Sequence, residues 1–148
     1  MTTFLARTSI VVTLLLVSAG VSVATAQTKL PVINVTVQYT GKAQVTDKTP
    51  IWVFLFNTPN PDGGTPPLVA KRLAKNGGVV QFEYGGTDPA YVFVALDTKG
   101  DYDGNSGPPP IGTPIGSYSS DGKTATAVKI MPTTNIKITF NDAVTYQP

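Results

Sequence analysis

The densest group of side chains that could do chemistry lies in segment 97–105, which reads Asp-Thr-Lys-Gly-Asp-Tyr-Asp-Gly-Asn. Within it stand four carboxylate or amide side chains: Asp97, Asp101, Asp103 and Asn105. In a loop, residues at positions i, i+2 and i+4 can turn such groups inward around one hard cation. Calcium takes about six to eight oxygen ligands and accepts backbone carbonyls among them. The spacing therefore predicts a calcium site with these four residues as ligands.

This segment matches the EF-hand calcium loop only in part. Asp101, Asp103 and Asn105 occupy the first three ligand positions, but Ser106 stands where a glycine is needed and Gly112 where a bidentate glutamate is needed. The segment is therefore not an EF-hand. The alternative is a turn whose Asp and Asn side chains bind the loop's own backbone, because these residues are common in turns for that reason.

Residue types exclude most catalytic arrangements. The chain has no histidine and no cysteine, which excludes a Ser-His-Asp triad, a Cys-His pair and zinc sites built on imidazole or thiolate. A pair of carboxylates, as in glycoside hydrolysis, would need one acid in an apolar setting. Glu83, the only glutamate, lies beside the outward-facing Gln81 and is expected to be solvated. We therefore expect no enzyme activity.

A second group of side chains is aromatic. Trp52, Phe54 and Phe56 share one face of a strand, and Tyr91 and Phe93 lie on another. Exposed rings of this kind can serve as stacking platforms for sugars. The alternative is a second layer of core beneath loops or a facing sheet, since large aromatic side chains are normally buried.

The acidic loop and the aromatic side chains lie among short β-branched and aromatic runs that glycine and proline separate. This pattern is typical of an all-β sandwich or barrel. Runs 51–56 and 91–96 are apolar on both faces and predict central strands. An Asn-Gly-Gly turn at Asn76 predicts a hairpin, and a long loop is expected from Asp97 to about Pro114. The seven predicted strands are 33–40, 51–56, 68–73, 79–84, 91–96, 125–131 and 136–140.

The stretch from Tyr91 to Tyr118 resembles bacterial secreted domains of the prealbumin-like, carboxypeptidase-regulatory type. Three features in order carry the resemblance: an apolar strand ending at Asp97, the motif Gly-Asp-x-Asp-Gly-Asn, and the sequence Gly-Thr-Pro-Ile-Gly-Ser-Tyr from Gly112. It implies a Greek-key β-sandwich of about seven strands, in which the loop of Asp97, Asp101, Asp103 and Asn105 binds calcium in some relatives. Prolines stand here where many relatives carry a further acidic residue. Most such domains have no known activity.

The N-terminal residues predict export. Arg7, the apolar run 10–17 and the sequence Ala24-Thr25-Ala26 are typical of a signal peptide over 1–26, followed by a single β-sandwich domain over 27–148. Without cysteine, the mature chain can form no disulfide and carry no lipid on a cysteine at its cleavage site. The sequence predicts a secreted or periplasmic protein with no membrane span after cleavage.

The net charge of the chain indicates which classes of partner to expect. The formal net charge is only +2, and Lys71 and Arg72 are the sole adjacent basic pair, so nucleic acid is not an expected partner. We expect a noncatalytic structural or interaction module of the bacterial cell envelope, stiffened by calcium, whose partner is a protein or a polysaccharide. The alternative is a carbohydrate-binding module that uses exposed aromatic side chains.

Overall fold

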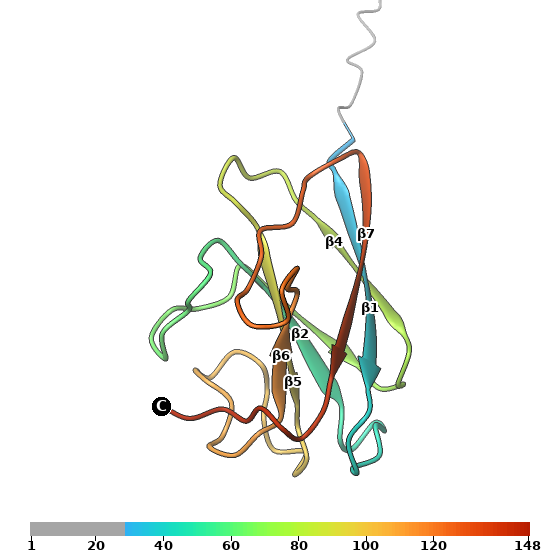
Figure 1. Ribbon diagram of the computed structural model, residues 1–148, viewed down its shortest axis with the longest axis vertical. Helices are drawn as coiled ribbons and strands as arrows, with labels where there is room; N and C mark the ends of the chain where they lie inside the picture. The colour runs from blue at the N-terminus through green and yellow to red at the C-terminus, as the bar shows by residue number, and fades with distance from the viewer. Residues whose placement is uncertain (1–28) are drawn as a thin grey trace, which may run out of the picture.

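A computed structural model describes residues 29–148, and the predicted signal peptide lies outside the described residues. In this described part the chain forms seven strands and no helix (Figure 1). The strands are β1 (Val32–Tyr39), β2 (Ile51–Phe56), β3 (Val69–Leu73), β4 (Val79–Glu83), β5 (Tyr91–Leu96), β6 (Ile115–Ser117) and β7 (Thr133–Phe140). The all-β prediction with about seven strands is confirmed.

One sheet has the order β4-β1-β7. Its central strand β1 pairs antiparallel with β4 and parallel with β7, from Val32 opposite Thr133 to Tyr39 opposite Phe140. Figure 1 shows β1 and β7 running side by side in the same direction. Along both strands buried and more exposed residues alternate, as the sequence predicts for a sheet with one face in solvent.

The other sheet has the order β3-β2-β5-β6, and all its ladders are antiparallel. The predicted central position of β2 and β5 is confirmed. Their inner faces, with Ile51, Val53 and Val92 fully buried, pack against the first sheet in one hydrophobic cluster that includes Ile33 and Ile138. The core therefore lies between the two sheets, and the outer aromatic face of β2 and β5 has to be covered by something other than a sheet.

Two predicted elements are wrong. Segment 125–131 forms only an isolated bridge between Val128 and Ala90, while the unpredicted strand β6 pairs with β5 through three residues. The turn at Asn76 is not a hairpin, because β3 and β4 belong to different sheets. The Asn76 side chain instead binds both backbone polar groups of Tyr39, at 2.8 Å from the N–H and 2.7 Å to the carbonyl, and so fastens the crossover to the end of β1.

Candidate functional site

Asp97, the first residue after β5, anchors the long loop 97–114. Its side chain is 3% exposed. One carboxylate oxygen, Oδ1, accepts hydrogen bonds from the N–H groups of Lys99 at 3.2 Å and Gly100 at 2.7 Å, and Oδ2 accepts one from Tyr102 at 3.1 Å. These contacts satisfy the backbone of a tight turn. Asp97 thus makes the backbone contacts expected in an Asx-rich turn.

The other three predicted calcium ligands lie further along the same loop. Asp103 accepts 2.8 Å hydrogen bonds from the backbone N–H groups of Asn105 and Ser106 and one from the Ser106 hydroxyl. The Ser106 hydroxyl, together with these N–H groups, holds the pKa of Asp103 below its usual value. Asp101 and Asn105 are exposed. Among residues 29–148 no three acidic side chains gather as a metal-binding cluster, and calcium binding stays a prediction.

Trp52 lies under this loop. Its ring is half-buried, with the Tyr102 ring edge-on at a centroid distance of 6.1 Å. Gly104, at φ +78°, approaches so closely that a Cβ atom there would lie 2.5 Å from Trp52 Cε3. The Trp52 Nε1 is buried without a hydrogen-bond partner among the described residues. Trp52 is therefore a support for the loop rather than an open stacking platform.

Phe54 and Phe56 of β2 and Phe93 of β5 belong to a second apolar cluster, which lies on the outer face of the sheet. Phe54 and Phe56 are 5% and 8% exposed, and Phe93 is half-buried. The Phe56 and Phe93 rings pack edge to face at a centroid distance of 5.6 Å, and Phe54 lies 6.2 Å from Tyr102. Phe54 and Phe56 belong to a second layer of core, which was the alternative interpretation of the aromatic pattern.

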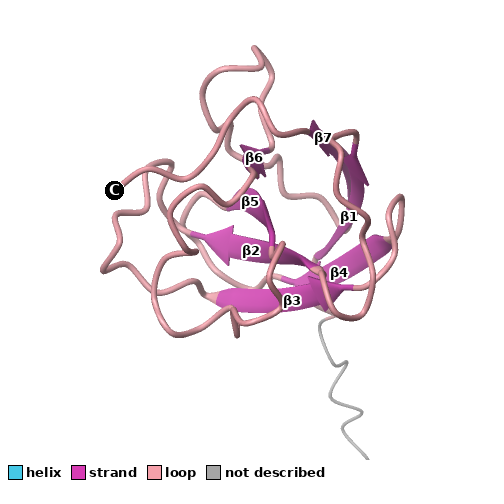
Figure 2. Ribbon diagram, turned by 90° about the horizontal axis from the view of Figure 1, so that it is seen from below, coloured by secondary structure: helices cyan, strands magenta, loops and turns pink. Residues whose placement is uncertain are grey.

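A cavity of about 570 Å³ lies over this cluster. We call it the outer pocket. Phe54, Phe56 and Phe93 form its floor, and three segments far apart in the sequence border it: the loop 57–68, the loop 97–114 and the C-terminal tail 141–148. Figure 1 shows the three segments on the side of the molecule away from β1 and β7, and Figure 2 shows the C-terminus beside β2, β5 and β6.

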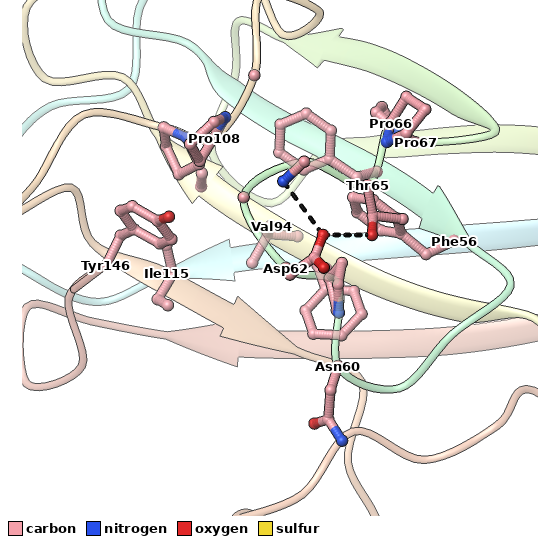
Figure 3. A pocket seen from close by; sticks show the side chains of 18 of the residues that line it. Phe56, Asn60, Asp62, Thr65, Pro66, Pro67, Val94, Pro108, Ile115 and Tyr146 are labelled. Atoms are coloured by element: carbon pink, nitrogen blue, oxygen red, sulfur yellow. Dashed lines mark hydrogen bonds between the residues drawn. The ribbon is translucent and has the colours of Figure 1, made fainter. Parts of the chain in front are cut away.

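Backbone and side-chain hydrogen bonds hold the walls of the outer pocket. The tail pairs with the loop 97–114 through Tyr146, whose N–H donates to Thr113 at 2.8 Å and whose carbonyl accepts from Gly112 at 2.9 Å. In the loop 57–68, Asp62 Oδ1 accepts hydrogen bonds from the Gly64 N–H at 3.1 Å and the Thr65 hydroxyl at 2.6 Å. Figure 3 shows Asp62 and Thr65 so joined, with Tyr146 among the other lining residues.

The lining of the outer pocket carries one formal charge. Asp62 is its only carboxylate, and no Lys or Arg borders it among residues 29–148. The Thr65 hydroxyl and the Gly64 N–H hold the pKa of Asp62 below its usual value, so this carboxylate is ionised at neutral pH. Burial, together with the negative charge of Asp103, raises the pKa of Tyr102 to about 12. The neutral Tyr102 hydroxyl donates a hydrogen bond to the Gly107 carbonyl at 2.7 Å.

Sequence reasoning identified part of this site and missed the rest. The aromatic floor and the loop 97–114 were singled out, but Asp62 and Tyr146 were not. The loop 57–68 is also long and rich in proline, which is a signal for a functional loop. Nothing in the sequence around Tyr146 marks it as a pocket residue.

Comparisons with family models, with curated proteins and with solved structures each gave no match. Over the described residues, no helix is long and apolar enough to cross a membrane. The resemblance to prealbumin-like domains and the Greek-key connection therefore stay predictions.

Proposed function

We propose that this protein is a noncatalytic binding module of the bacterial cell envelope that holds its ligand in the outer pocket. The observation that carries the proposal is the pocket itself, about 570 Å³ in volume, preformed above an aromatic floor and outside the main core. Pockets of about 300–1,000 Å³ with mostly apolar walls and a few placed polar groups are the usual form of small-molecule sites.

The lining of the pocket supports binding rather than chemistry. Hydrolysis by paired carboxylates needs two acids about 5–10 Å apart. Asp62 is the single carboxylate on the pocket wall in the described part of the chain, and its pKa is lowered rather than raised. A general acid needs the opposite shift.

The predicted calcium ligands lie on the loop 97–114, which also borders the outer pocket. Tyr102 and Asn105 of that loop border the outer pocket, while Asp97 and Asp101 lie at its other side, beside a small second cavity of about 130 Å³ that Lys99 also borders. An ion held by the predicted ligands Asp97, Asp101, Asp103 and Asn105 would stiffen this wall of the pocket. Residues 1–26 predict export to the periplasm or the medium, and the periplasmic destination would place the module in the envelope.

A carbohydrate ligand is the second candidate function. Amide side chains at Asn60, Asn105 and Gln147 border the same pocket as the partly exposed rings of Phe93 and Tyr102. Rings that bind the apolar face of a sugar, beside amides that bind its hydroxyls, are a suitable combination. In this version of the proposal the sugar binds in the outer pocket, not on Trp52.

The test uses the neutral dye Nile red, whose emission rises in apolar surroundings, and a variant that fills the pocket. A side chain at Gly63 would begin 3.5 Å from both Pro108 and the Tyr146 hydroxyl, an ordinary contact, and Gly63 has no positive φ to strain. Gly63→Leu should therefore fold and block the pocket. Asn57→Leu adds the same side chain to the same loop at an exposed position outside the pocket.

We expect one dye per chain in the parent and in Asn57→Leu, and at least about tenfold weaker binding in Gly63→Leu, since a leucine would occupy space that the dye needs. Displacement of the dye by a neutral oligosaccharide would favour the carbohydrate candidate. Equal binding by all three proteins would show that the dye sits elsewhere and would remove the basis of the proposal.

A further inference from the structure

The outer pocket has a charge pattern as well as a shape. Its one formal charge is the carboxylate of Asp62, and among the described residues no basic side chain compensates it there. An anionic ligand would face this carboxylate without a counter-charge, and a neutral ligand could only donate a hydrogen bond to it. A cationic ligand would supply the missing partner.

The Asp62 carboxylate has a fixed orientation that suits pairing with a cationic ligand. Both of its side-chain hydrogen bonds, from Gly64 and Thr65, are accepted at Oδ1. They fix the orientation of the side chain and leave Oδ2 for a ligand. The loop is further stiffened by Pro59, Pro61 and the adjacent prolines that border the pocket, because proline restricts the backbone. Little conformational freedom therefore remains to be lost when a ligand pairs with Asp62.

The aromatic floor favours the same ligand. Ring faces carry partial negative charge and attract ammonium groups within about 6 Å of the ring centroid. Phe93 and the neutral Tyr102 keep part of their surface exposed in the pocket. Rings of this kind also pack well against a flat apolar body.

We infer that the ligand of the outer pocket is an organic cation, with a flat apolar or aromatic body that packs on the floor and an ammonium group that pairs with Asp62 Oδ2. This inference rests on the proposed binding function and names the class of its ligand. A single ring with a short amine-bearing chain carries both features in one small molecule, and a cavity of about 570 Å³ admits larger ones.

The experiment compares three probes of equal size and different charge at neutral pH: 2-phenylethylamine, 2-phenylethanol and phenylacetate. Binding is followed by chemical-shift changes of backbone amides in the loop 57–68. The variant is Asp62→Asn, which keeps an oxygen for the Gly64 and Thr65 hydrogen bonds and removes only the charge. Asp88→Asn, at an exposed carboxylate outside the pocket, is the matched control.

We expect the amine to bind about threefold more tightly than the alcohol, the advantage of an exposed ion pair, and phenylacetate to bind most weakly. Asp62→Asn should remove the difference between amine and alcohol, and Asp88→Asn should keep it. High salt should also reduce the difference, because it screens an exposed pair.

Equal binding of amine and alcohol, or a preference that survives Asp62→Asn, would overturn the inference while leaving the pocket as a binding site. It would also be overturned if Nile red binds and none of the three probes does, or if only a neutral oligosaccharide displaces the dye. Failure of the dye and of every probe would instead count against the proposed function itself.

Discussion

Replacement of Asp97 by asparagine tests whether this residue anchors the loop that forms one wall of the outer pocket. The carboxylate is 3% exposed and accepts three backbone hydrogen bonds, from Lys99, Gly100 and Tyr102. Asparagine keeps one oxygen, which can serve Lys99 and Gly100. Its NH₂ group would then face the N–H of Tyr102, so that one hydrogen bond is lost and two donors meet.

A hydrogen bond to a charged group contributes about 1.5–3 kcal/mol, and a buried donor left without an acceptor costs a similar amount. We therefore expect Asp97→Asn to lower the free energy of unfolding by about 2–3 kcal/mol. In a domain of this size that corresponds to a fall in Tm of roughly 8–12 °C. Urea unfolding followed by the emission of Trp52, which lies beneath the loop, measures the change.

The matched control is Asp101→Asn in the same loop. Asp101 is exposed and makes no hydrogen bond within the described part of the chain, so its replacement should change the free energy of unfolding in chelator by less than about 0.5 kcal/mol. If Asp97→Asn proves as harmless as Asp101→Asn, the three hydrogen bonds do not anchor the loop and the argument for a preformed pocket wall is wrong.

Three other variants or conditions test neighbouring features. Gly104→Ala should destabilise the fold by at least about 1 kcal/mol more than Gly112→Ala in urea unfolding, because both have positive φ but only the first would contact the Trp52 ring; equal effects would contradict that contact. Millimolar calcium should raise Tm relative to chelator by several degrees in the parent and less in Asp101→Asn, and an unchanged Tm would count against the calcium prediction. The raised pKa of Tyr102, about 12 against 10.0, favours its neutral form in the folded state. The contribution of Tyr102 to stability should thus be constant below pH 10 and be lost as pH rises toward 12. The alkaline loss of stability, measured by urea unfolding at pH 9 and 11.5, should therefore be smaller in Tyr102→Phe.

The strands were predicted well where their signal is local. The alternation in β1 and β7 and the two-sided apolar runs of β2 and β5 come from the chain's own residues, and the structure confirms each as a strand. In contrast, β6 consists only of Ile115, Gly116 and Ser117, too short to show alternation, and its pairing depends on the exposed edge of β5. Segment 125–131 has the composition of a strand but finds only one bridging partner, at Ala90.

The candidate site also combines features that local sequence predicts with features that depend on distant parts of the chain. The turn contacts of Asp97 and Asp103 reach no further than five residues along the chain, and an Asx-rich turn was among the interpretations that the sequence allowed. The outer pocket unites Asp62, Tyr102 and Tyr146 from three separate segments. No local pattern relates these residues, so only the folded chain could show that they face one cavity.

By itself, the sequence determined the all-β class, the absence of histidine and cysteine with the chemistry this excludes, and the residues able to satisfy tight turns. Alternation and turn hydrogen bonds act over a few residues, and therefore the sequence displays them directly. Tertiary structure decided that β1 pairs in parallel with β7, about a hundred residues away, and that loops and the C-terminal tail rather than a sheet cover the aromatic face of β2. Such choices depend on which distant surfaces bury the most apolar area together, a property of the whole chain and not of any segment.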